Sequence, residues 1–476
     1  MQNNHNNELE FQLTGKLAFI RTFGCRANVS DSEKISGMLA ELGYGFTRNM
    51  EEADLILFNT CAVRENAETR VFGNVGALIH LKRKNPDLII AVCGCMVQQE
   101  HITKKLYDTY PFVSLIFGTH VLHKLPELLK ETLSGKRVIN IDNYEHIITE
   151  DLPIKREVEK PEGEEGKIKA DVSIMYGCDN YCSYCIVPYV RGRERSRKPT
   201  AILNEIQMLI MDGYKEITLL GQNVNSYAGD SESGDKITFA ELLKQIESIS
   251  GEFRVSYMTS HPKDLTKDVI DVIANSEKIS YHLHLPVQAG SNRVLEVMNR
   301  GYTIEQYLQI VEYARSKILD VSLTTDIIVG FPGETREEFL ETLNLLERVK
   351  FDSAFTFIYS KREGTKAAEM DDTVSSEEKS AWFTEMLDVL DKVSGDAYER
   401  FVGKTLRVLC EGVGRTGEYE FSGRSREGVI VEFNASSNSE AHLDTINHAT
   451  IIGEFVDVKI NKALKWAVIG ELSIVD

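Results

Sequence analysis

Between residue 16 and about residue 148, short apolar segments alternate with longer segments of helical periodicity. The apolar segments include LAFIRTFG, DLILFNTCAV and DLIIAVCGC, and amphipathic segments such as SEKISGMLAELGY and VFGNVGALIHLKRKN lie between them. This alternation is typical of βαβ units, in which helices cover a parallel sheet. The pattern therefore predicts an N-terminal α/β domain over residues 15–148.

The apolar pattern stops between residues 149 and 167. The sequence there, TEDLPIKREVEKPEGEEGK, is rich in charge and contains proline and glycine. An exposed connection between domains has this composition. We therefore expect a linker at this point of the chain.

A second α/β array follows over residues 168–400. Six predicted strands (ADVSIMYGC, EITLLGQNV, RVSYMT, YHLHLPVQ, VSLTTDIIVGF and SAFTFIYS) alternate with helices such as 201–213, 239–250 and 335–349. Six parallel strands with helices between them predict a partial (β/α)6 barrel, whose ligands bind at the C-terminal ends of the strands. A last long helix is expected from about residue 376 to about residue 401.

After residue 401 the chain changes to short strands broken by glycines, as in GKTLRVLCEGV and GEFVDVKINKALKWAVIGEL. This pattern predicts a small all-β barrel of the OB-like kind over residues 401–474. The chain is thus expected to be an α/β protein of three domains, with the linker between the first and the second.

Composition limits where the protein works and what it binds. The polar N-terminus MQNNHNNELE lacks the apolar region of a signal peptide, and the apolar stretches are too short to span a bilayer. We therefore expect a cytoplasmic protein that does not associate with membranes. The net charge of −19 argues against indiscriminate nucleic-acid binding, so an RNA partner requires a local basic surface. The run RGRERSRK at residues 191–198 is either such a surface or a solvated loop.

Three cysteines at the start of the second array carry the strongest chemical signal. Cys178, Cys182 and Cys185 have C-x3-C-x2-C spacing at the end of a predicted strand. Three thiolates can hold three irons of a 4Fe-4S cube and leave the fourth iron open to a small molecule. A structural zinc ion would need a fourth protein ligand, and no other cysteine or histidine lies nearby in the sequence.

A second set of cysteines lies in the N-terminal domain. Cys25, Cys61 and Cys95 each follow a predicted strand and precede a helix. They are either ligands of a second iron-sulfur cluster, which helix N-termini favour, or three buried structural cysteines. Cys93 lies two residues before Cys95 on the same strand and would face the same side, so it is an alternative ligand. Cys410 is expected to be structural.

Several segments resemble the radical-SAM methylthiotransferase family. Besides the three N-terminal cysteine segments, these are YGCDNYCSYCIVPYVRGRERSR, LLGQNVNSY, SYMTSHP, HLHLPVQAGSNRVLEVMNRGYT and TDIIVGFPGET, and together they cover nearly the whole chain. The segment NTCAVRENAE is similar to the MiaB-type enzymes that act on isopentenyladenosine in tRNA. The alternatives within the family are enzymes for threonylcarbamoyl-adenosine in tRNA and RimO-type enzymes that modify a ribosomal-protein aspartate.

The resemblance implies a role for each set of cysteines. Cys25, Cys61 and Cys95 would hold an auxiliary 4Fe-4S cluster that carries the sulfur to be donated. The segment GCMVQQE is similar to the family's ligand segment, which favours Cys95 as the ligand and leaves Cys93 as a packed thiol. Cys178, Cys182 and Cys185 would hold the cluster that binds S-adenosylmethionine and cleaves it to a 5'-deoxyadenosyl radical. One S-adenosylmethionine would supply the methyl group, and the radical from a second would remove hydrogen from C2 of the adenosine.

Contacts to S-adenosylmethionine are expected at the ends of the barrel strands. Each candidate has a structural role as its alternative, because polar strand ends and glycine turns occur in any α/β enzyme. The candidates are Tyr184, Gln222, Asn223, Ser256, Gln288, Asp326 and Gly330. His282 and His284 are expected to make buried hydrogen bonds rather than to bind a metal.

The expected partner is the anticodon loop of tRNA, whose bases can be splayed and stacked. The C-terminal barrel resembles a TRAM domain, an RNA-binding domain, although it has more acidic than basic residues. The candidate RNA contacts are Arg191, Arg193, Arg195, Arg424, Arg426 and Trp466. The resemblance also implies an electron donor such as a flavodoxin and a sulfur source, and we expect a monomer. A non-catalytic iron-sulfur protein that binds RNA is the alternative outside the family.

Overall fold

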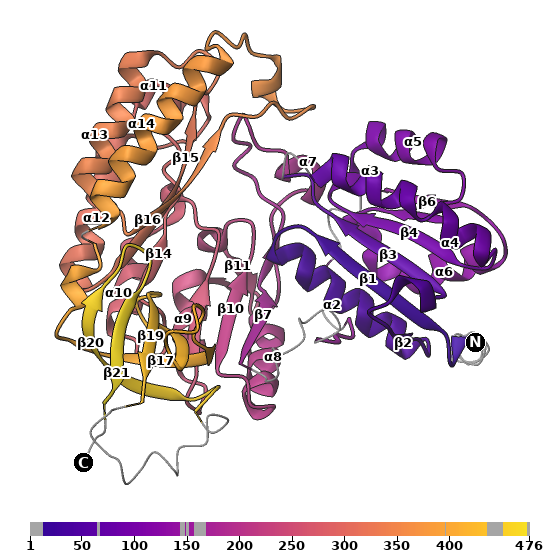
Figure 1. Cartoon of the computed structure of the whole chain (residues 1–476), viewed down its shortest axis with the longest axis horizontal. Coiled ribbons are helices and arrows are strands. Elements are labelled where there is room, and N and C mark those ends of the chain that lie inside the picture. The colour runs from indigo at the N-terminus through magenta and orange to yellow at the C-terminus, as the bar shows by residue number, and fades with distance from the viewer. Residues whose placement is uncertain are drawn as a thin grey trace. The chain divides into compact units, whose positions relative to one another are not determined.

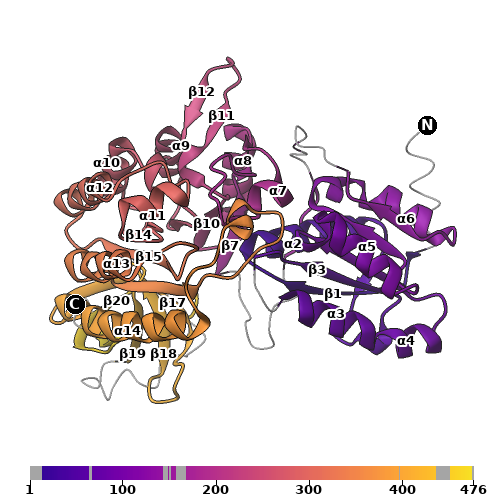
Figure 2. The ribbon, with the colours of Figure 1, turned by 90° about the horizontal axis from the view of Figure 1, so that it is seen from above.

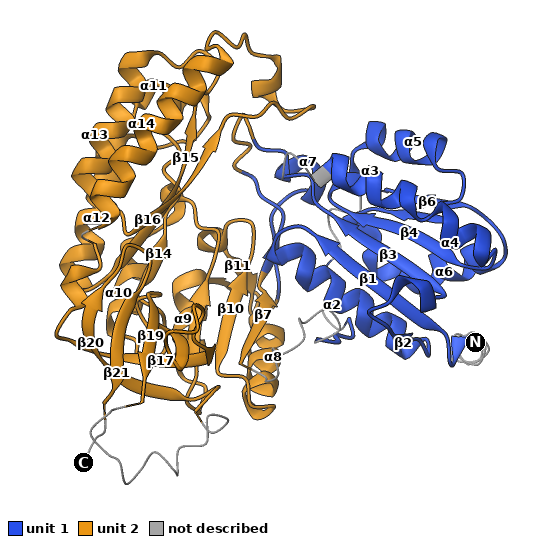
Figure 3. Ribbon diagram, in the orientation of Figure 1, with its two compact units in different colours: residues 1–163, 175–179, 185–197 blue, residues 164–174, 180–184, 198–476 orange. Residues whose placement is uncertain are grey.

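The computed structural model describes residues 13–63, 67–142, 148, 152–156, 168–395, 397–435 and 451–473. Most of the expected linker and of the polar N-terminus lies outside these residues. The chain forms two compact units (Figure 3). Unit 1 consists of residues 1–163, 175–179 and 185–197, and unit 2 consists of residues 164–174, 180–184 and 198–476. The expected domain boundaries themselves stay a prediction.

Unit 1 is built on a six-stranded parallel sheet with the order β2-β1-β3-β4-β5-β6 (Figure 1). Its strands are β1 (Leu17–Phe23), β2 (Gly45–Phe46), β3 (Leu55–Thr60), β4 (Ile89–Gly94), β5 (Leu115–Phe117) and β6 (Val138–Asn140). The central strands β3 and β4 are buried along their whole length, which explains their nearly continuous apolar sequences.

Helices cover both faces of this sheet (Figure 2). Helices α2 (Arg26–Glu41) and α6 (Leu125–Leu133) pack against one face, where Leu55 and Leu57 of β3 enter the core. Helices α3 (Ala67–Ala77), α4 (Ile79–Lys84) and α5 (Glu100–Thr109) cover the other face, to which Ile56 and Phe58 point. The α/β architecture expected for the N-terminal region is confirmed.

Unit 2 contains six parallel strands in two three-stranded sheets. The first sheet has the order β13-β10-β7 and the second has the order β14-β15-β16. A parallel bridge between Val255 and Ile279 links them. The strands are β7 (Lys169–Ser173), β10 (Glu216–Leu220), β13 (Arg254–Tyr257), β14 (His282–His284), β15 (Ser322–Val329) and β16 (Ser353–Ile358). The open parallel array confirms the expected partial barrel.

The helices of this array begin where their sequences predict. Capping boxes at Thr238, Thr303 and Thr335 start α9, α12 and α13, because each threonine pairs with the third helical residue. The helices are α8 (Pro199–Met211), α9 (Phe239–Glu247), α10 (Lys267–Asn275), α11 (Asn292–Val297), α12 (Ile304–Lys317), α13 (Arg336–Val349) and α14 (Ser376–Gly395). A small hairpin, β11 (Ala228–Asp230) and β12 (Lys236–Thr238), precedes α9.

The C-terminal part of unit 2 is a closed five-stranded barrel with the order β17-β18-β19-β21-β20. Its strands are β17 (Thr405–Val413), β18 (Phe421–Ser425), β19 (Ile430–Asn434), β20 (Phe455–Ala463) and β21 (Val468–Leu472). Phe421 and Phe433 stack in its core with ring centroids 5.4 Å apart. The expected small all-β barrel is therefore confirmed. Across the described residues, no helix combines the length and the hydropathy needed to cross a bilayer.

Candidate iron-sulfur sites

The three N-terminal cysteines follow three adjacent strands of the unit 1 sheet. Cys25 comes after β1, Cys61 directly after β3 and Cys95 directly after β4. The last residues of these three strands pair with one another in the strand register, so the strands end at the same level. The sheet thus carries residues that are distant in sequence to one edge, as parallel sheets do.

Asn28, in the first turn of α2, is the polar side chain that two of the thiols share. The Sγ atom of Cys25 lies 3.4 Å from Asn28 Oδ1, and Asn28 Nδ2 lies 3.9 Å from the Sγ atom of Cys95. Asn28 is fully buried and also donates hydrogen bonds to Asn59 Oδ1 and to the main-chain oxygen of Thr60. Cys25 and Cys95 therefore meet at one firmly held amide group.

The Cys61 thiol completes the group through a hydrogen bond with Cys25. This bond lowers the pKa of Cys25 to about 5, and the positive charge of Arg191 acts in the same direction against the effect of burial. The same bond raises the pKa of Cys61, and burial raises the pKa of Cys95. The charge of Cys95 also raises the pKa of Cys61, so the three thiols affect one another electrostatically.

Three cysteine sulfurs without a fourth protein ligand fit a 4Fe-4S cluster with one open iron. Each cysteine of such a cube binds a different iron, so the sulfurs surround the cluster instead of converging on one point. The donor set therefore matches a cluster better than a zinc ion, which needs four converging ligands.

Cys93 and Cys95 have separate surroundings despite their closeness in sequence. Cys93 packs in the apolar core beneath α2 and α6, whereas Cys95 packs with Ile186 and Val190 of the segment that follows the central cysteines. The separation arises at Gly94, which ends β4 with a φ of +99°. The strand alternation that would put both thiols on one side thus stops between them, which favours Cys95 as the ligand.

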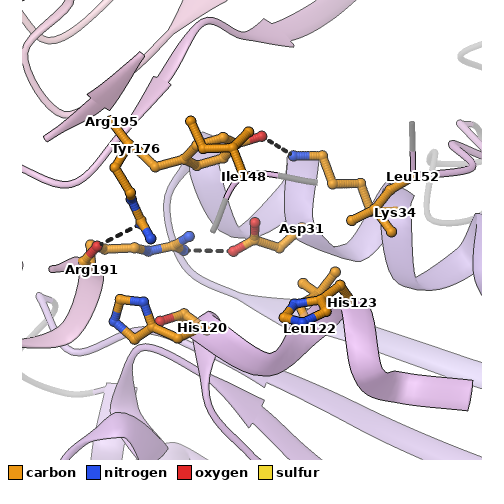
Figure 4. Close-up of a pocket in the computed structure, with 11 residues that line it drawn as sticks. Asp31, Lys34, His120, Leu122, His123, Ile148, Leu152, Tyr176, Arg191 and Arg195 are labelled. Carbon is orange, nitrogen blue, oxygen red and sulfur yellow. Dashed lines mark hydrogen bonds and ion pairs between the residues drawn. The ribbon is translucent and has the colours of Figure 1, made fainter. Parts of the chain in front are cut away.

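Arg191 extends the site beyond the cysteines. It ends α7 (Val187–Arg191) and is 6% exposed. Its Nε donates to the Sγ atom of Cys95 at 3.0 Å, and its Nη2 lies 2.7 Å from Asp31 Oδ2 (Figure 4). Arg191 and Asp31 also line a cavity of about 70 Å³, together with residues that include Lys34, His120 and Tyr176.

The central cysteines lie on the loop between β8 (Met175–Tyr176) and α7. Cys178 and Cys185 belong to unit 1, where the main-chain N–H of Cys178 donates to Gly192 at 3.1 Å. Cys182 belongs to unit 2, where it is buried and its Sγ accepts a hydrogen bond from Arg300 Nη1 at 3.3 Å. Within unit 2, Asn299 Nδ2 holds this loop by donating to the main-chain oxygen of Tyr181 at 3.0 Å.

Unpartnered amide groups mark the end of β10. The side-chain oxygens of Gln222 and Asn223 are buried and accept no hydrogen bond among the described residues, and neither amide atom of Asn225 has a partner. Asn223 Nδ2 donates to Asp264 at 2.7 Å, which fixes that side chain. Buried polar atoms without partners are costly, so this strand end fits a polar ligand such as S-adenosylmethionine.

The other candidate S-adenosylmethionine contacts of unit 2 lie among strand ends and loops. The Tyr184 hydroxyl accepts a hydrogen bond from Arg300 Nη1 at 3.4 Å, and the hydroxyl oxygens of Ser256 and Thr218 lie 3.0 Å apart. Gln288 has a left-handed backbone with a φ of +76°, a strained conformation that is common at functional sites. Asp326 Oδ1 lies 3.5 Å from His284 Nε2.

Gly330 and the two histidines are also placed by local contacts. The main-chain N–H of Gly330 donates to Glu334 at 2.7 Å, and the aliphatic part of Lys379 occupies the space that a side chain at residue 330 would need. His282 and His284 both form hydrogen bonds with the hydroxyl of Thr324, at 2.8 and 3.0 Å. These are the hydrogen bonds expected of the histidines.

The candidate RNA contacts divide into engaged and exposed side chains. Arg191 is buried, so it binds Asp31 and Cys95 instead of forming a basic surface. Arg424 donates to the main-chain oxygen of Gly428, and Arg426 donates to those of Ser276 and Ile279, which ties the β-barrel to the rest of unit 2. Arg195 donates to the main-chain oxygen of Arg191 at 3.1 Å. The exposed candidates are Arg193 and Trp466. Arg193 Nη1 lies 3.5 Å from Asp179 Oδ1, and Trp466 is 45% exposed.

Sequence reasoning missed Asn28, Asp31 and Arg300, although all three lie in the segments that carry the family resemblance. Asn28 and Asp31 stand three and six residues after Cys25, which places them near that thiol on the helix that follows it. Arg300 is separated from Cys182 by more than a hundred residues, so no local signal in the sequence connects the two.

Three family models match successive parts of the chain. Residues 17–118 match an uncharacterized protein family, UPF0004, residues 172–346 match the Radical SAM superfamily and residues 399–473 match the TRAM domain. Among solved structures, the radical S-adenosylmethionine methyltransferase TsrM from Kitasatospora setae is similar over 74% of each chain, with a TM-score of 0.54 and 13% identity. At this identity the likeness concerns the fold alone.

Curated relatives are similar along almost the entire chain. The tRNA-2-methylthio-N(6)-dimethylallyladenosine synthase of Acetivibrio thermocellus is 48% identical over 96% of this chain and 91% of its own length. The enzyme of the same name from Clostridium perfringens is 49% identical over 98% of this chain and 99% of its own length. With the radical SAM and TRAM matches, these relatives show that the chain belongs to the family of tRNA-2-methylthio-N(6)-dimethylallyladenosine synthases, which are radical-SAM methylthiotransferases.

Proposed function

We propose that this chain transfers a methylthio group to C2 of N6-isopentenyladenosine beside the anticodon of tRNA, and that it consumes two S-adenosylmethionine molecules per turnover. The meeting of Cys25, Cys61 and Cys95 at one sheet edge carries the proposal, because sulfur insertion requires a cluster besides the one that cleaves S-adenosylmethionine. The family membership supports the tRNA substrate over a ribosomal-protein aspartate or threonylcarbamoyl-adenosine.

The residues divide the work between the two cysteine sets. Cys25, Cys61 and Cys95 would hold an auxiliary 4Fe-4S cluster, and Cys178, Cys182 and Cys185 would hold the radical-SAM cluster. When bound, these clusters and S-adenosylmethionine supply the radical and sulfur chemistry that protein side chains lack. The amides of Gln222, Asn223 and Asn225 offer buried polar atoms to S-adenosylmethionine. Tyr184, Ser256, Gln288, Asp326 and Gly330 are proposed as further contacts to it.

The partners follow from this reaction. The substrate is tRNA, and Arg193 and Trp466 are exposed side chains that could bind its backbone and stack on its bases. An electron donor such as a flavodoxin would reduce the clusters, and a sulfur source would replace the sulfur that each turnover consumes. We place the enzyme in the cytoplasm, because tRNA modification takes place there. We also propose that it acts as a monomer.

The test is an anaerobic assay of the reconstituted full-length chain. Iron and sulfide are counted, and about eight irons per chain are expected for two cubes. The enzyme is then incubated with isopentenylated tRNA, S-adenosylmethionine and dithionite, and the nucleosides are analysed by mass spectrometry. We expect the methylthio-nucleoside together with 5'-deoxyadenosine.

Two cysteine variants separate the roles. Cys61→Ala should still cleave S-adenosylmethionine but should form no methylthio-nucleoside, whereas Cys93→Ala, two residues from a proposed ligand, should retain both activities. Methylthio product from Cys61→Ala would refute the auxiliary cluster. Unmodified tRNA beside a methylthiolated protein aspartate would select the RimO-type reaction. Intact S-adenosylmethionine in all samples would select a non-catalytic RNA-binding protein.

A further inference from the structure

Two buried arginines each donate a hydrogen bond to one cysteine sulfur, and each does so at a different cysteine set. Arg191 donates to Cys95, and Arg300 donates to Cys182, at N to S distances of 3.0 and 3.3 Å. The two contacts are independent, because the first lies within unit 1 and the second within unit 2. The exposed fractions of the two arginines are only 6% and 4%.

Arg191 is fixed in position from both ends of its guanidinium group. Asp31 Oδ2 lies 2.7 Å from Nη2 (Figure 4). Nε donates to the Cys95 sulfur at 3.0 Å. The main-chain oxygen of Arg191 accepts a hydrogen bond from Arg195. Because the guanidinium group is planar, the carboxylate at Nη2 also fixes the direction of the Nε–H bond, so the contact with Cys95 is preorganised.

Arg300 is held by neutral groups. Its Nη2 donates to the main-chain oxygen of Pro286 at 2.7 Å, its Nε donates to the Tyr302 hydroxyl at 3.2 Å, and its Nη1 faces both Cys182 and Tyr184. Among the described residues no carboxylate pairs with Arg300. A buried cation without a counter-ion is strongly unfavourable, and an anionic iron-sulfur cluster held by Cys182 would supply the missing negative charge.

We propose that Arg191 and Arg300 are positioning residues that set the reduction potentials of the two iron-sulfur clusters, Arg191 through Cys95 and Arg300 through Cys182. The inference rests on the proposed function in one respect, that both cysteine sets hold clusters. Hydrogen bonds to the sulfurs and nearby charge are the protein's means of changing a cluster's potential. A cationic donor stabilises the reduced cluster more than the oxidised cluster, because reduction adds negative charge. Each arginine therefore raises the potential of its own cluster.

The experiment is a potentiometric titration of the reconstituted full-length chain, followed by electron paramagnetic resonance without tRNA or S-adenosylmethionine. Cys61→Ala and Cys182→Ala identify which reduction wave belongs to which cluster. In Arg191→Gln, the reduced-to-oxidised ratio of the auxiliary cluster at the wild-type midpoint should fall about tenfold, which equals about 59 mV for a one-electron couple. The reduction potential of the radical-SAM cluster should not change in this variant. Arg300→Gln should show the reverse pattern.

Two further variants control for charge and for folding. Arg348→Gln removes an exposed arginine of α13 and should change neither reduction potential. Arg191→Lys keeps the positive charge, but a single ammonium group cannot bind both Asp31 and Cys95. The reduction potential of the auxiliary cluster should therefore shift in the same direction as in Arg191→Gln, by a smaller amount. If Arg191→Gln or Arg300→Gln loses iron, the corresponding lysine variant becomes the test.

The reciprocal pattern separates this proposal from a general loosening of the fold. Wild-type potentials in the iron-loaded glutamine and lysine variants would overturn it, as would a glutamine variant that shifts both waves equally. Because the titration contains no substrate, a failed tRNA assay beside the reciprocal shifts would refute the proposed reaction and leave the role of the arginines standing. A single reduction wave in the wild type would instead refute the two clusters on which both proposals depend.

Discussion

Asn28 and Asn59 are joined by two hydrogen bonds in opposite directions: Asn28 Nδ2 donates to Asn59 Oδ1 at 3.1 Å, and Asn59 Nδ2 donates to the main-chain oxygen of Asn28 at 2.8 Å. Both residues are fully buried. Asn28 lies at the start of the helix after Cys25, and Asn59 lies two residues before Cys61. The pair therefore holds two of the three proposed ligands of the auxiliary cluster at a fixed separation.

We predict that Asn28→Ala weakens the auxiliary cluster. The substitution leaves Asn59 Oδ1 and the Thr60 carbonyl without a donor, and each unsatisfied buried group costs about 1–3 kcal/mol. Iron analysis after reconstitution should fall from about eight toward about four irons per chain. Asn74→Ala, which removes a partly exposed asparagine of α3, should keep the full iron content. Full iron content in Asn28→Ala would show that the pair is dispensable.

Gly94 provides a second test of the same sheet edge. A Cβ atom at this position would lie 2.4 Å from both Asn59 Oδ1 and the Thr60 carbonyl oxygen. Gly94→Ala should therefore displace Cys95 and lower the iron content. Gly213→Ala is the matched control, because Gly213 also has a positive φ, +96°, but open space where its Cβ would be. It should cost only about 1 kcal/mol of backbone strain and retain all iron. Equal iron losses in both variants would refute the steric explanation.

Glu334 should make the stability of the protein depend on pH. Burial raises the pKa of this carboxyl from 4.5 to about 7, although the N–H groups of Phe331 and Gly330 oppose the shift. Because the pKa of Glu334 is higher in the folded than in the unfolded protein, its protonated carboxyl contributes fully to the free energy of unfolding below about pH 4.5. This contribution is lost as the pH rises through 7.

Glu334→Gln mimics the protonated carboxyl and should therefore raise the melting temperature relative to the wild type at pH 8. The difference should disappear near pH 5, and thermal unfolding of both proteins across this range measures it. Ionisation of Glu334 lowers the free energy of unfolding of the wild type at pH 8 by at most about 3 kcal/mol. A Glu334→Gln variant that melts below the wild type at pH 8 would contradict this account.

The candidate RNA contacts should separate into two classes when substituted. Trp466→Ala and Arg193→Ala should weaken tRNA binding without a change in melting temperature, because both side chains are exposed and a stacked base contributes about 1–3 kcal/mol. Arg426→Ala should lower the melting temperature, because it loses its hydrogen bonds to the main chain at Ser276 and Ile279. Binding isotherms and thermal unfolding of the three variants distinguish the classes. If Trp466→Ala and Arg193→Ala bind tRNA with unchanged affinity, these two side chains are not part of the RNA interface.

The sequence was sufficient for the order of the elements and for the placement of Cys25, Cys61 and Cys95 after strands of the N-terminal sheet. Apolar segments and capping residues are local, and cysteines at strand ends of a parallel sheet must meet at one edge. The family resemblance of the GCMVQQE segment favoured Cys95 over Cys93 as the ligand. Strand alternation alone would put both thiols on one side, because it ignores the positive φ of Gly94. The basic run at residues 191–198 suggested a surface, whereas Arg191 pairs with an acid 160 positions earlier in the chain, Asp31. Pairings over such separations leave no local pattern.

The division of the chain into units has a consequence for its engineering. Residues 175–179 and 185–197 complete unit 1, yet they come after the first strand of unit 2. A fragment cut at the expected linker would lack Arg191, so its Asp31 carboxylate would be left buried without its cation and Cys95 without its donor. The N-terminal cysteine domain therefore cannot be transferred alone: a chimaera that grafts it onto another radical-SAM protein must also replace the recipient's corresponding segment with residues 175–179 and 185–197 of this chain.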